Sequence, residues 1–132
     1  RRDHGLRIQV PLYCCPIYEY AEGRYVLLHH NNDGHFEGSE REETGKNRRP
    51  AFIALGEYRP DAEQPIWFSG SKEFFDNDGV GIGPLTRIDC GVYPSVTKRN
   101  GNFVLWHPDR KFFLLGKKIT GEWLSTLEVP GK

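Results

Sequence analysis

The chain has 132 residues, 37% of them apolar and 13% aromatic, which is enough for one domain with a hydrophobic core. Its 18 basic and 18 acidic side chains cancel, so it lacks the basic surface typical of proteins that bind nucleic acids or membrane surfaces. We therefore expect neither a nucleic-acid nor a membrane partner. The chain contains no methionine, which indicates a processed chain or a piece of a longer protein.

The first predicted elements belong to a pattern that occurs twice. Residues 23–29 (GRYVLLH) are similar to residues 101–107 (GNFVLWH), and a second apolar stretch follows each of them, 52–56 (FIALG) and 112–116 (FFLLG). Each copy contains two apolar strands with a turn before them and a polar loop between them, which is typical of a repeated sheet unit. The loop is longer in the first copy. Because insertions in repeats lie on a rim where ligands bind, this loop is the first place to look for function.

In chain order, the predicted strands are residues 17–20, 25–31, 51–58 and 66–75 in the first unit and 91–97, 103–107 and 111–119 in the second. Turn residues separate them, because Gly23, residues 59–61, residues 77–79 and Asn100-Gly101 supply a positive or a preset φ. Asn-Gly between two apolar runs is the strongest short hairpin signal. No stretch has convincing helical periodicity, so the sequence predicts an all-β chain.

Apolar residues follow one another without alternation at 25–28 and 103–106, so both faces of these strands should be buried. Four-stranded antiparallel units covered on both faces are the blades of a β-propeller, and we predict blade one at about 16–75 and blade two at about 88–129. Propellers need about four to eight blades. We therefore expect further blades of the same polypeptide, or other copies of the chain, as partners. The alternative fold is a β-sandwich, whose strands would alternate more clearly.

Four stretches carry a resemblance to a known family: NRRPAFIALGE (47–57), QPIWFS (64–69), DNDGV (76–80) and VLWHPDRKFFLLG (104–116). Together they resemble bacterial sialidase-like (BNR-type) β-propeller proteins that act on carbohydrates, and the likeness covers most of residues 16–119. The resemblance implies a carbohydrate substrate, a secreted or periplasmic location, and either glycoside hydrolysis or polysaccharide elimination.

The chain departs from this family in two ways. The Ser-x-Asp-x-Gly-x-Thr-Trp hairpin of sialidases is absent, since Lys72 and Glu73 follow Ser69 and Ser71. In addition, the three arginines, the Tyr/Glu nucleophile pair and the acid/base aspartate of such a sialidase have no assigned counterparts in this sequence. The resemblance is therefore more specific for the fold than for the reaction.

The densest polar cluster is residues 29–35 (HHNNDGH), and Arg48 and Arg49 follow the long loop. For β-elimination from a uronic acid, His29 or His30 would be the base, Arg49 would bind the carboxylate, and Tyr93 or a second histidine would be the acid. We predict a catalytic set of His30, Arg49 and Tyr93. The predicted substrate-binding residues are His29, Asn31, Asn32, Arg48 and Tyr18.

Hydrolysis would require something different, namely two carboxyl groups that flank the scissile bond, about 5 Å apart in a retaining enzyme and further apart in an inverting one. The sequence does not single out such a pair. Its candidates are Asp33, Glu57, Asp76, Asp78 and Asp89.

Each candidate also has a structural interpretation. His29 and His107 occupy matching positions of the repeat, which favours a structural role at a strand end. A zinc site of His29, His30 and His35 is disfavoured because neighbouring strand residues face opposite sides, so we predict no metal and no cofactor. Residues 76–79 begin like a calcium loop but lack the closing glutamate of an EF-hand, which favours a turn.

The three cysteines, Cys14, Cys15 and Cys90, have no metal-binding spacing. We interpret them as small buried hydrophobic residues, with one bridge to Cys90 as the alternative.

These observations leave three hypotheses for the function. The first is a segment of a carbohydrate-active enzyme, a sialidase-like glycoside hydrolase or a polysaccharide lyase, that acts on an acidic glycan. The second is a non-catalytic glycan-binding module, and the third is a scaffold whose exposed blade faces recruit other blades or chains.

Overall fold

The computed structural model describes residues 15–30, 49–84 and 86–131. Of the predicted site, Asn31, Asn32 and Arg48 lie outside these residues, as do Asp33 and His35. The described chain is built from antiparallel β-sheets and contains one short helix, so the prediction of an all-β protein is confirmed.

The first sheet contains the strands of the first predicted unit. Its strands pair in the order β1-β2-β3-β4, and β5 also pairs with β3. The bounds are β1 Ile17–Ala21, β2 Arg24–His30, β3 Ala51–Tyr58, β4 Ile66–Phe68 and β5 Lys72–Phe75. In β2, Val26 and Leu28 face the same side as Leu55 and Ile53 of β3, because these residues are paired across the ladder.

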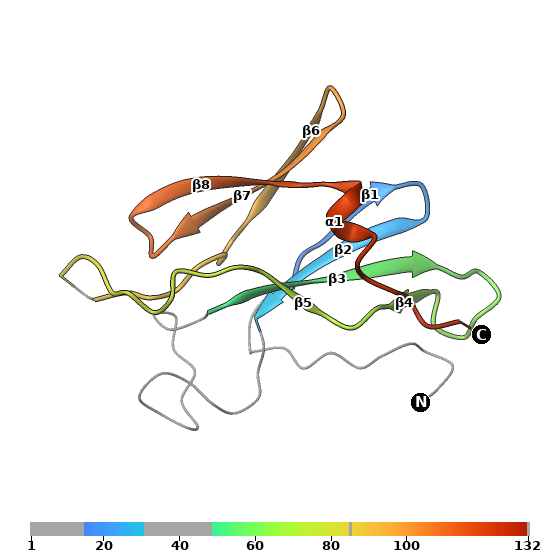
Figure 1. Ribbon diagram of the computed structural model, residues 1–132. Helices are drawn as coiled ribbons and strands as arrows, with labels where there is room; N and C mark the ends of the chain where they lie inside the picture. Colours follow the sequence, from blue (N-terminus) through green and yellow to red (C-terminus); the bar gives the residue numbers. More distant parts are fainter. Residues whose placement is uncertain (1–14, 31–48, 85, 132) are drawn as a thin grey trace.

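The second sheet has the order β6-β7-β8. Its strands are β6 Ser95–Arg99, β7 Asn102–Asp109 and β8 Phe113–Ile119, and helix α1 Gly121–Leu124 follows. In Figure 1 this sheet lies above the first one, with α1 beside the two sheets and the C-terminus near β4.

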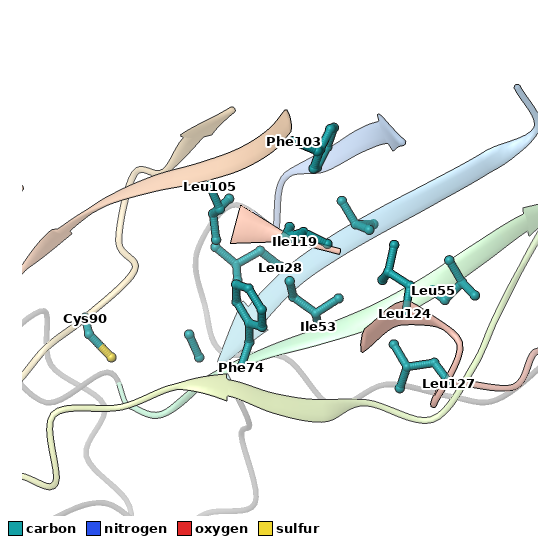
Figure 2. Close-up of a cluster of buried hydrophobic side chains, with 12 residues drawn as sticks. Leu28, Ile53, Leu55, Phe74, Cys90, Phe103, Leu105, Ile119, Leu124 and Leu127 are labelled. Atoms are coloured by element: carbon teal, nitrogen blue, oxygen red, sulfur yellow. The ribbon is translucent and has the colours of Figure 1, made fainter. Parts of the chain in front are cut away.

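The hydrophobic core lies between the two sheets and under α1. Figure 2 shows side chains from β2, β3, β7, β8 and α1 pointing into one shared space. The most buried large members are at most 2% exposed and come from both sheets: Val26, Leu28, Ile53, Leu55, Leu105 and Ile119. Burial of each such side chain contributes about 1.5–3 kcal/mol, so this contact is the main force that holds the sheets together.

Two of the predicted turns have the backbone conformation that the sequence required. Asn100 and Gly101 both have positive φ, 52° and 76°, and join β6 to β7 as a two-residue hairpin loop. Asp78 and Gly79 likewise have φ of 57° and 72°, and the Val80 N–H donates to the Asn77 carbonyl. Residues 76–79 are therefore a turn, as we predicted.

The strand predicted at 66–75 is interrupted at Ser69. The ladder of β3 shifts by one residue between β4 and β5, as in a β-bulge. Ser69 is fully buried at this point, and its hydroxyl accepts a hydrogen bond from the Leu55 N–H at 2.9 Å. A side-chain bond therefore replaces a ladder bond there.

Two other predicted elements differ from the structure. The strand expected at 91–97 begins only at Ser95, because Tyr93 has a φ of 58° and cannot extend the ladder. Helix α1 was not predicted, since it has a single turn and no periodicity to detect. Its N-cap is Thr120, whose side chain accepts a hydrogen bond from the Trp123 N–H.

The prediction that both faces of the repeated strands are buried holds for one copy only. In β2 every residue from Val26 to His30 is buried, whereas β7 alternates, with Phe103 and Leu105 buried and Trp106 36% exposed. The outer face of the second sheet is therefore uncovered within the described residues. This alternation is what the β-sandwich alternative required, and the assignment of propeller blades stays a prediction.

No helix in the described part of the chain is long and apolar enough to cross a membrane.

The core packing generates a first prediction. Leu28→Ala removes a side chain that is 1% exposed and leaves a cavity between the sheets, so the free energy of unfolding should fall by about 2–5 kcal/mol. Leu114→Ala is the matched control, because Leu114 is 71% exposed and its loss should change stability by about 0.5 kcal/mol or less. Urea denaturation of both variants measures the difference, and equal values would contradict the assigned core.

Candidate functional site

Three arginine–aspartate pairs lie where β2 ends, β3 begins, and β5 and β7 end. We call these residues the arginine–aspartate cluster: Arg49–Asp76, Arg87–Asp89 and Arg110–Asp109. The cluster contains one predicted catalytic residue, Arg49. It also adjoins Cys90, whose carbonyl bonds to a second predicted catalytic residue, His30.

Arg49 stands just before β3, and Asp76 stands just after β5. The Arg49 Nε donates to Asp76 Oδ1 at 2.9 Å, and its Nη2 donates to Oδ2 at 2.7 Å. This is the two-bond geometry in which a carboxylate fixes the plane of a guanidinium. The side chains are 19% and 14% exposed, so Arg49 is held firmly at the edge of solvent and not inside the core.

The other two pairs are joined through the backbone. Arg87 contacts Asp89 with two bonds of 2.8 and 3.0 Å, and the Arg110 N–H donates to the Asp89 carbonyl at 2.7 Å. The guanidinium of Arg110 bonds to Asp109 at 2.7 Å. Because Arg87 and Arg110 are both 17% exposed, the cluster presents three guanidinium groups near the surface, each oriented by its own carboxylate.

Cys90 lies beside the cluster and is 1% exposed, at the edge of the core in Figure 2. Burial raises the pKa of its thiol to about 12, with further contributions from the negative charges of Asp76, Asp109 and Asp89. The thiolate is the reactive form of cysteine, so Cys90 is not a nucleophile at neutral pH. The predicted burial is therefore confirmed for Cys90, whereas Cys15 is only partly buried and Cys14 lies outside the described residues.

His30, the predicted base, bonds to the main chain. Its Nε2 lies 2.5 Å from the Cys90 carbonyl oxygen. A carbonyl can only accept, so Nε2 carries the proton and donates it. The side chain is 2% exposed. In this arrangement His30 joins the end of β2 to the segment before β6, which is a structural contact.

His29 points to the other side of the sheet from His30, as expected for neighbouring strand residues. Its Nδ1 donates to the His30 carbonyl at 2.9 Å, which leaves Nε2 as the acceptor for the Ser71 hydroxyl at 2.6 Å. Its ring also stacks on Phe52, with 5.7 Å between centroids. Burial lowers the pKa of His29, and the bond to the His30 carbonyl opposes this shift in part. His29 is therefore neutral near pH 7.

His107 is the counterpart of His29 in the repeat. Its ring stacks on Phe75 with centroids 3.7 Å apart and planes within 7°. Burial lowers its pKa, while a bond to the Pro108 backbone and the charge of Asp109 act in the opposite direction. Both histidines thus make packing contacts, which supports the structural strand-end role.

Tyr93 has the most unusual backbone among the predicted site residues. A φ of 58° is uncommon for a bulky residue, and such strained conformations are concentrated at functional sites. The side chain is 72% exposed, and the Lys111 ammonium lies 5.8 Å from the centroid of its ring. Tyr93 therefore projects into solvent near the cluster.

The segment around Tyr93 is anchored on both sides. Gly91 has a φ of 71°, and a Cβ there would lie 2.9 Å from the ring of Phe75, so only glycine fits. On the other side, the Tyr18 hydroxyl donates to the Pro94 carbonyl at 2.9 Å. Burial raises the pKa of Tyr18 and favours its neutral form as a donor. Tyr18, which we predicted as a substrate contact, holds the backbone next to Tyr93, and its substrate role stays a prediction.

The structure separates the remaining carboxylate candidates. Asp76 and Asp89 are occupied by arginines, Asp78 is in an exposed turn, and Glu57 is at the far end of β3. Asp109, Arg110, Arg87 and Ser71 were missed. The first two were visible in the sequence as HPDRK at the end of the second repeat. No local sequence pattern marked Arg87 or Ser71, because the residues around them in the structure are brought together only when the chain folds.

No group of His, Cys, Asp and Glu among the described residues has the geometry of a metal site. We also compared the chain with models of protein families, with curated proteins and with solved structures, and none of them matches it. Fold and site thus define an all-β protein with two packed sheets and a polar cluster at one end.

The buried histidines His29 and His107 predict how stability depends on pH. Their pKa values are lower in the folded than in the unfolded chain, so the unfolded chain binds protons first as the pH falls. The free energy of unfolding should therefore be highest above about pH 6.5 and should decrease below it. His107→Phe keeps the stacking on Phe75 and removes one titrating group, so it should reduce the loss. Urea midpoints at about pH 7.5 and 5.5 measure this effect, and an unchanged loss in the variant would contradict it.

Proposed function

We propose that this chain is a segment of a carbohydrate-active enzyme that acts on an acidic glycan, as its resemblance to sialidase-like propeller proteins implies. In this proposal Tyr93 supplies the reacting hydroxyl, and the arginine–aspartate cluster binds the carboxylate of the sugar. Blade one and blade two of the predicted propeller correspond to the two sheets.

The conformation of Tyr93 is the observation that carries the proposal. A tyrosine held at positive φ costs about 1–3 kcal/mol, and Gly91 and Tyr18 maintain it on either side. The ring is mostly exposed, so its own packing does not explain why the fold keeps it in this conformation. A functional role for the projecting hydroxyl does explain it, and sialidases are the glycosidases that use a tyrosine nucleophile.

The arginines support a carboxylate-bearing substrate. Each guanidinium is held in place by its own aspartate at 2.7–2.8 Å, and Arg110 also donates from Nη1 to the Val80 carbonyl at 2.7 Å. Arginine side chains that are already fixed lose little conformational entropy when they bind an anion. Because each pair is neutral overall, the cluster favours a ligand recognised by oriented donors over one attracted by net charge.

The proposed roles differ from the predicted ones at the histidines. His30 donates to Cys90 and is buried, so it positions the segment that carries Tyr93 and does not act as the base. Arg49 keeps its predicted role toward the substrate carboxylate. A partner group that activates the Tyr93 hydroxyl would come from further blades or from outside the described residues.

The proposal predicts that Tyr93→Phe removes turnover and keeps binding. The substitution deletes one oxygen and leaves the ring and the backbone in place, so turnover should fall by about a hundredfold or more. Release of aryl alcohol from an aryl sialoside and formation of unsaturated uronate from polygalacturonate measure the two reactions. Tyr25→Phe on β2 is the matched control and should keep full turnover.

Arg49→Lys tests the second role. A lysine cannot reproduce the two-bond contact of a guanidinium, so the dissociation constant for the acidic glycan should rise by about tenfold. If the unmodified chain neither turns over nor binds sialosides and uronates, the proposed function is wrong.

An uncovered apolar surface favours a second function, that of an assembly element. Trp106 and Leu114 lie on the outer face of the second sheet, and Phe112, Phe113 and Leu115 are also 46–62% exposed. Apolar groups gathered in this way are typical of a surface that meets another protein layer. We infer that a further sheet, from the same polypeptide or from another copy, covers this face.

Solution mass tests the assembly function. If another copy covers the face, light scattering of the 132-residue chain should give a multiple of the 15.2 kDa monomer mass. Trp106→Gln should shift the mass toward the monomer, whereas Glu22→Gln, in the turn between β1 and β2, should not. A monomer that exposes no apolar surface to a hydrophobic dye would contradict an uncovered docking face.

A further inference from the structure

A cavity lies at the end of β3 that is remote from the arginine–aspartate cluster. It has a volume of about 730 Å³ and lies beside β4 and the C-terminal segment, near the label C in Figure 1. Its lining residues are Glu57, Tyr58, Arg59, Pro60, Asp61, Ala62, Glu63, Trp67 and Gly131. We call it the Trp67 pocket.

The backbone around the pocket is fixed by hydrogen bonds of its own. The Arg59 N–H donates to the Pro65 carbonyl at 2.7 Å, and the Ala62 N–H donates to the Arg59 carbonyl at 3.1 Å. Glu57 pairs with Trp67 across the β3–β4 ladder. The pocket is therefore a preformed feature of the sheet end, as ligand sites usually are.

Two buried donors of the pocket have no acceptor among the described residues. Trp67 is only 6% exposed, and its Nε1–H makes no hydrogen bond within this part of the chain. Arg59 stacks on this indole, with its guanidinium carbon 4.5 Å from the ring centroid. Its Nη1 is also buried and makes no hydrogen bond within this part of the chain. Buried polar groups are almost always paired, so these two donors call for an acceptor that a ligand would supply.

The charge of the pocket indicates the rest of the ligand. Glu57 and Asp61 line it together with one guanidinium, that of Arg59, so the formal charge of these three described residues is negative. The Glu57 side chain is 44% exposed and lies 3.5 Å from the Arg59 Nε. A uronate or sialate would be repelled here, whereas an ammonium group would be attracted.

We propose that the Trp67 pocket binds an amino sugar. Its hydroxyl and ring oxygens would accept from Trp67 and Arg59, and its ammonium would bind the carboxylates. The exposed ring of Tyr58 offers a flat face for a cation or a sugar ring. A lysine side chain is a poorer ligand, because its ammonium could bind the carboxylates but has no acceptor for the N–H groups of Trp67 and Arg59.

This inference does not depend on the proposed function. β3 runs from the Arg49 end of the sheet to the pocket over Ala51–Tyr58, so the two sites are about 23 Å apart at a rise of 3.3 Å per residue. The two sites also select opposite charges. Loss of turnover in Tyr93→Phe therefore leaves binding at the Trp67 pocket unchanged.

The experiment is an NMR titration of the indole N–H signals of the 132-residue chain with three trisaccharides. The probes are tri-glucosamine, its fully N-acetylated counterpart and tri-galacturonate. Trp106→Phe and Trp123→Phe assign the Trp67 signal by elimination, because the chain has three tryptophans. We expect tri-glucosamine to shift the Trp67 signal, the N-acetylated sugar to bind more weakly, and tri-galacturonate to have no effect.

Asp61→Asn keeps the shape of an exposed loop residue and removes one charge. It should weaken tri-glucosamine binding by up to about fivefold, the effect of one exposed ion pair. Glu22→Gln, in the turn between β1 and β2, is the matched control and should bind like the parent chain. The inference is overturned if tri-glucosamine leaves the Trp67 signal in place, if Asp61→Asn binds as well as the control, or if the N-acetylated sugar binds equally well.

Discussion

The hydrogen bond from His30 to the Cys90 carbonyl fixes the relation between the two sheets at their polar end. It joins the last residue of β2 to the segment that leads into β6, across 60 positions of the sequence. Next to Cys90, Asp89 accepts hydrogen bonds from the Arg87 side chain and from the Arg110 backbone N–H. On the other side of Cys90, Gly91 has a positive φ and turns the chain toward Tyr93. The hydrophobic core could hold two sheets face to face in several ways, but this polar contact selects one register for the segment between them.

The fold was largely accessible from the sequence because its signals are local. Apolar runs marked seven strands, and the dipeptide Asn100-Gly101 was sufficient to predict the β6–β7 hairpin. The burial of the repeated strands was predicted correctly for β2 and wrongly for β7. A run of apolar residues shows that a strand can be buried on both faces, but whether a second layer covers it is decided elsewhere in the chain.

The candidate site was less accessible, since its residues are defined by partners that are distant in the sequence. The residue types in HHNNDGH predicted a proton-transfer site, yet His29 and His30 bond to backbone carbonyls and to Ser71. Tyr93 was identified for its place in the second unit, while the backbone strain that distinguishes it can be seen only in three dimensions. The Trp67 pocket was not predicted from the sequence, because the pairing of buried donors is a property of the packing.

Cys90 makes its contact with His30 through its carbonyl group, and its thiol is shielded by burial and by neighbouring negative charge. Every amino acid carries the same carbonyl, so the contact requires a small side chain at this position and not a sulfur atom. Alanine or serine would leave the junction between the sheets in place. Chains that share this architecture are therefore free to differ at position 90, and the constant feature among them would be the histidine that donates to it and the glycine that follows it.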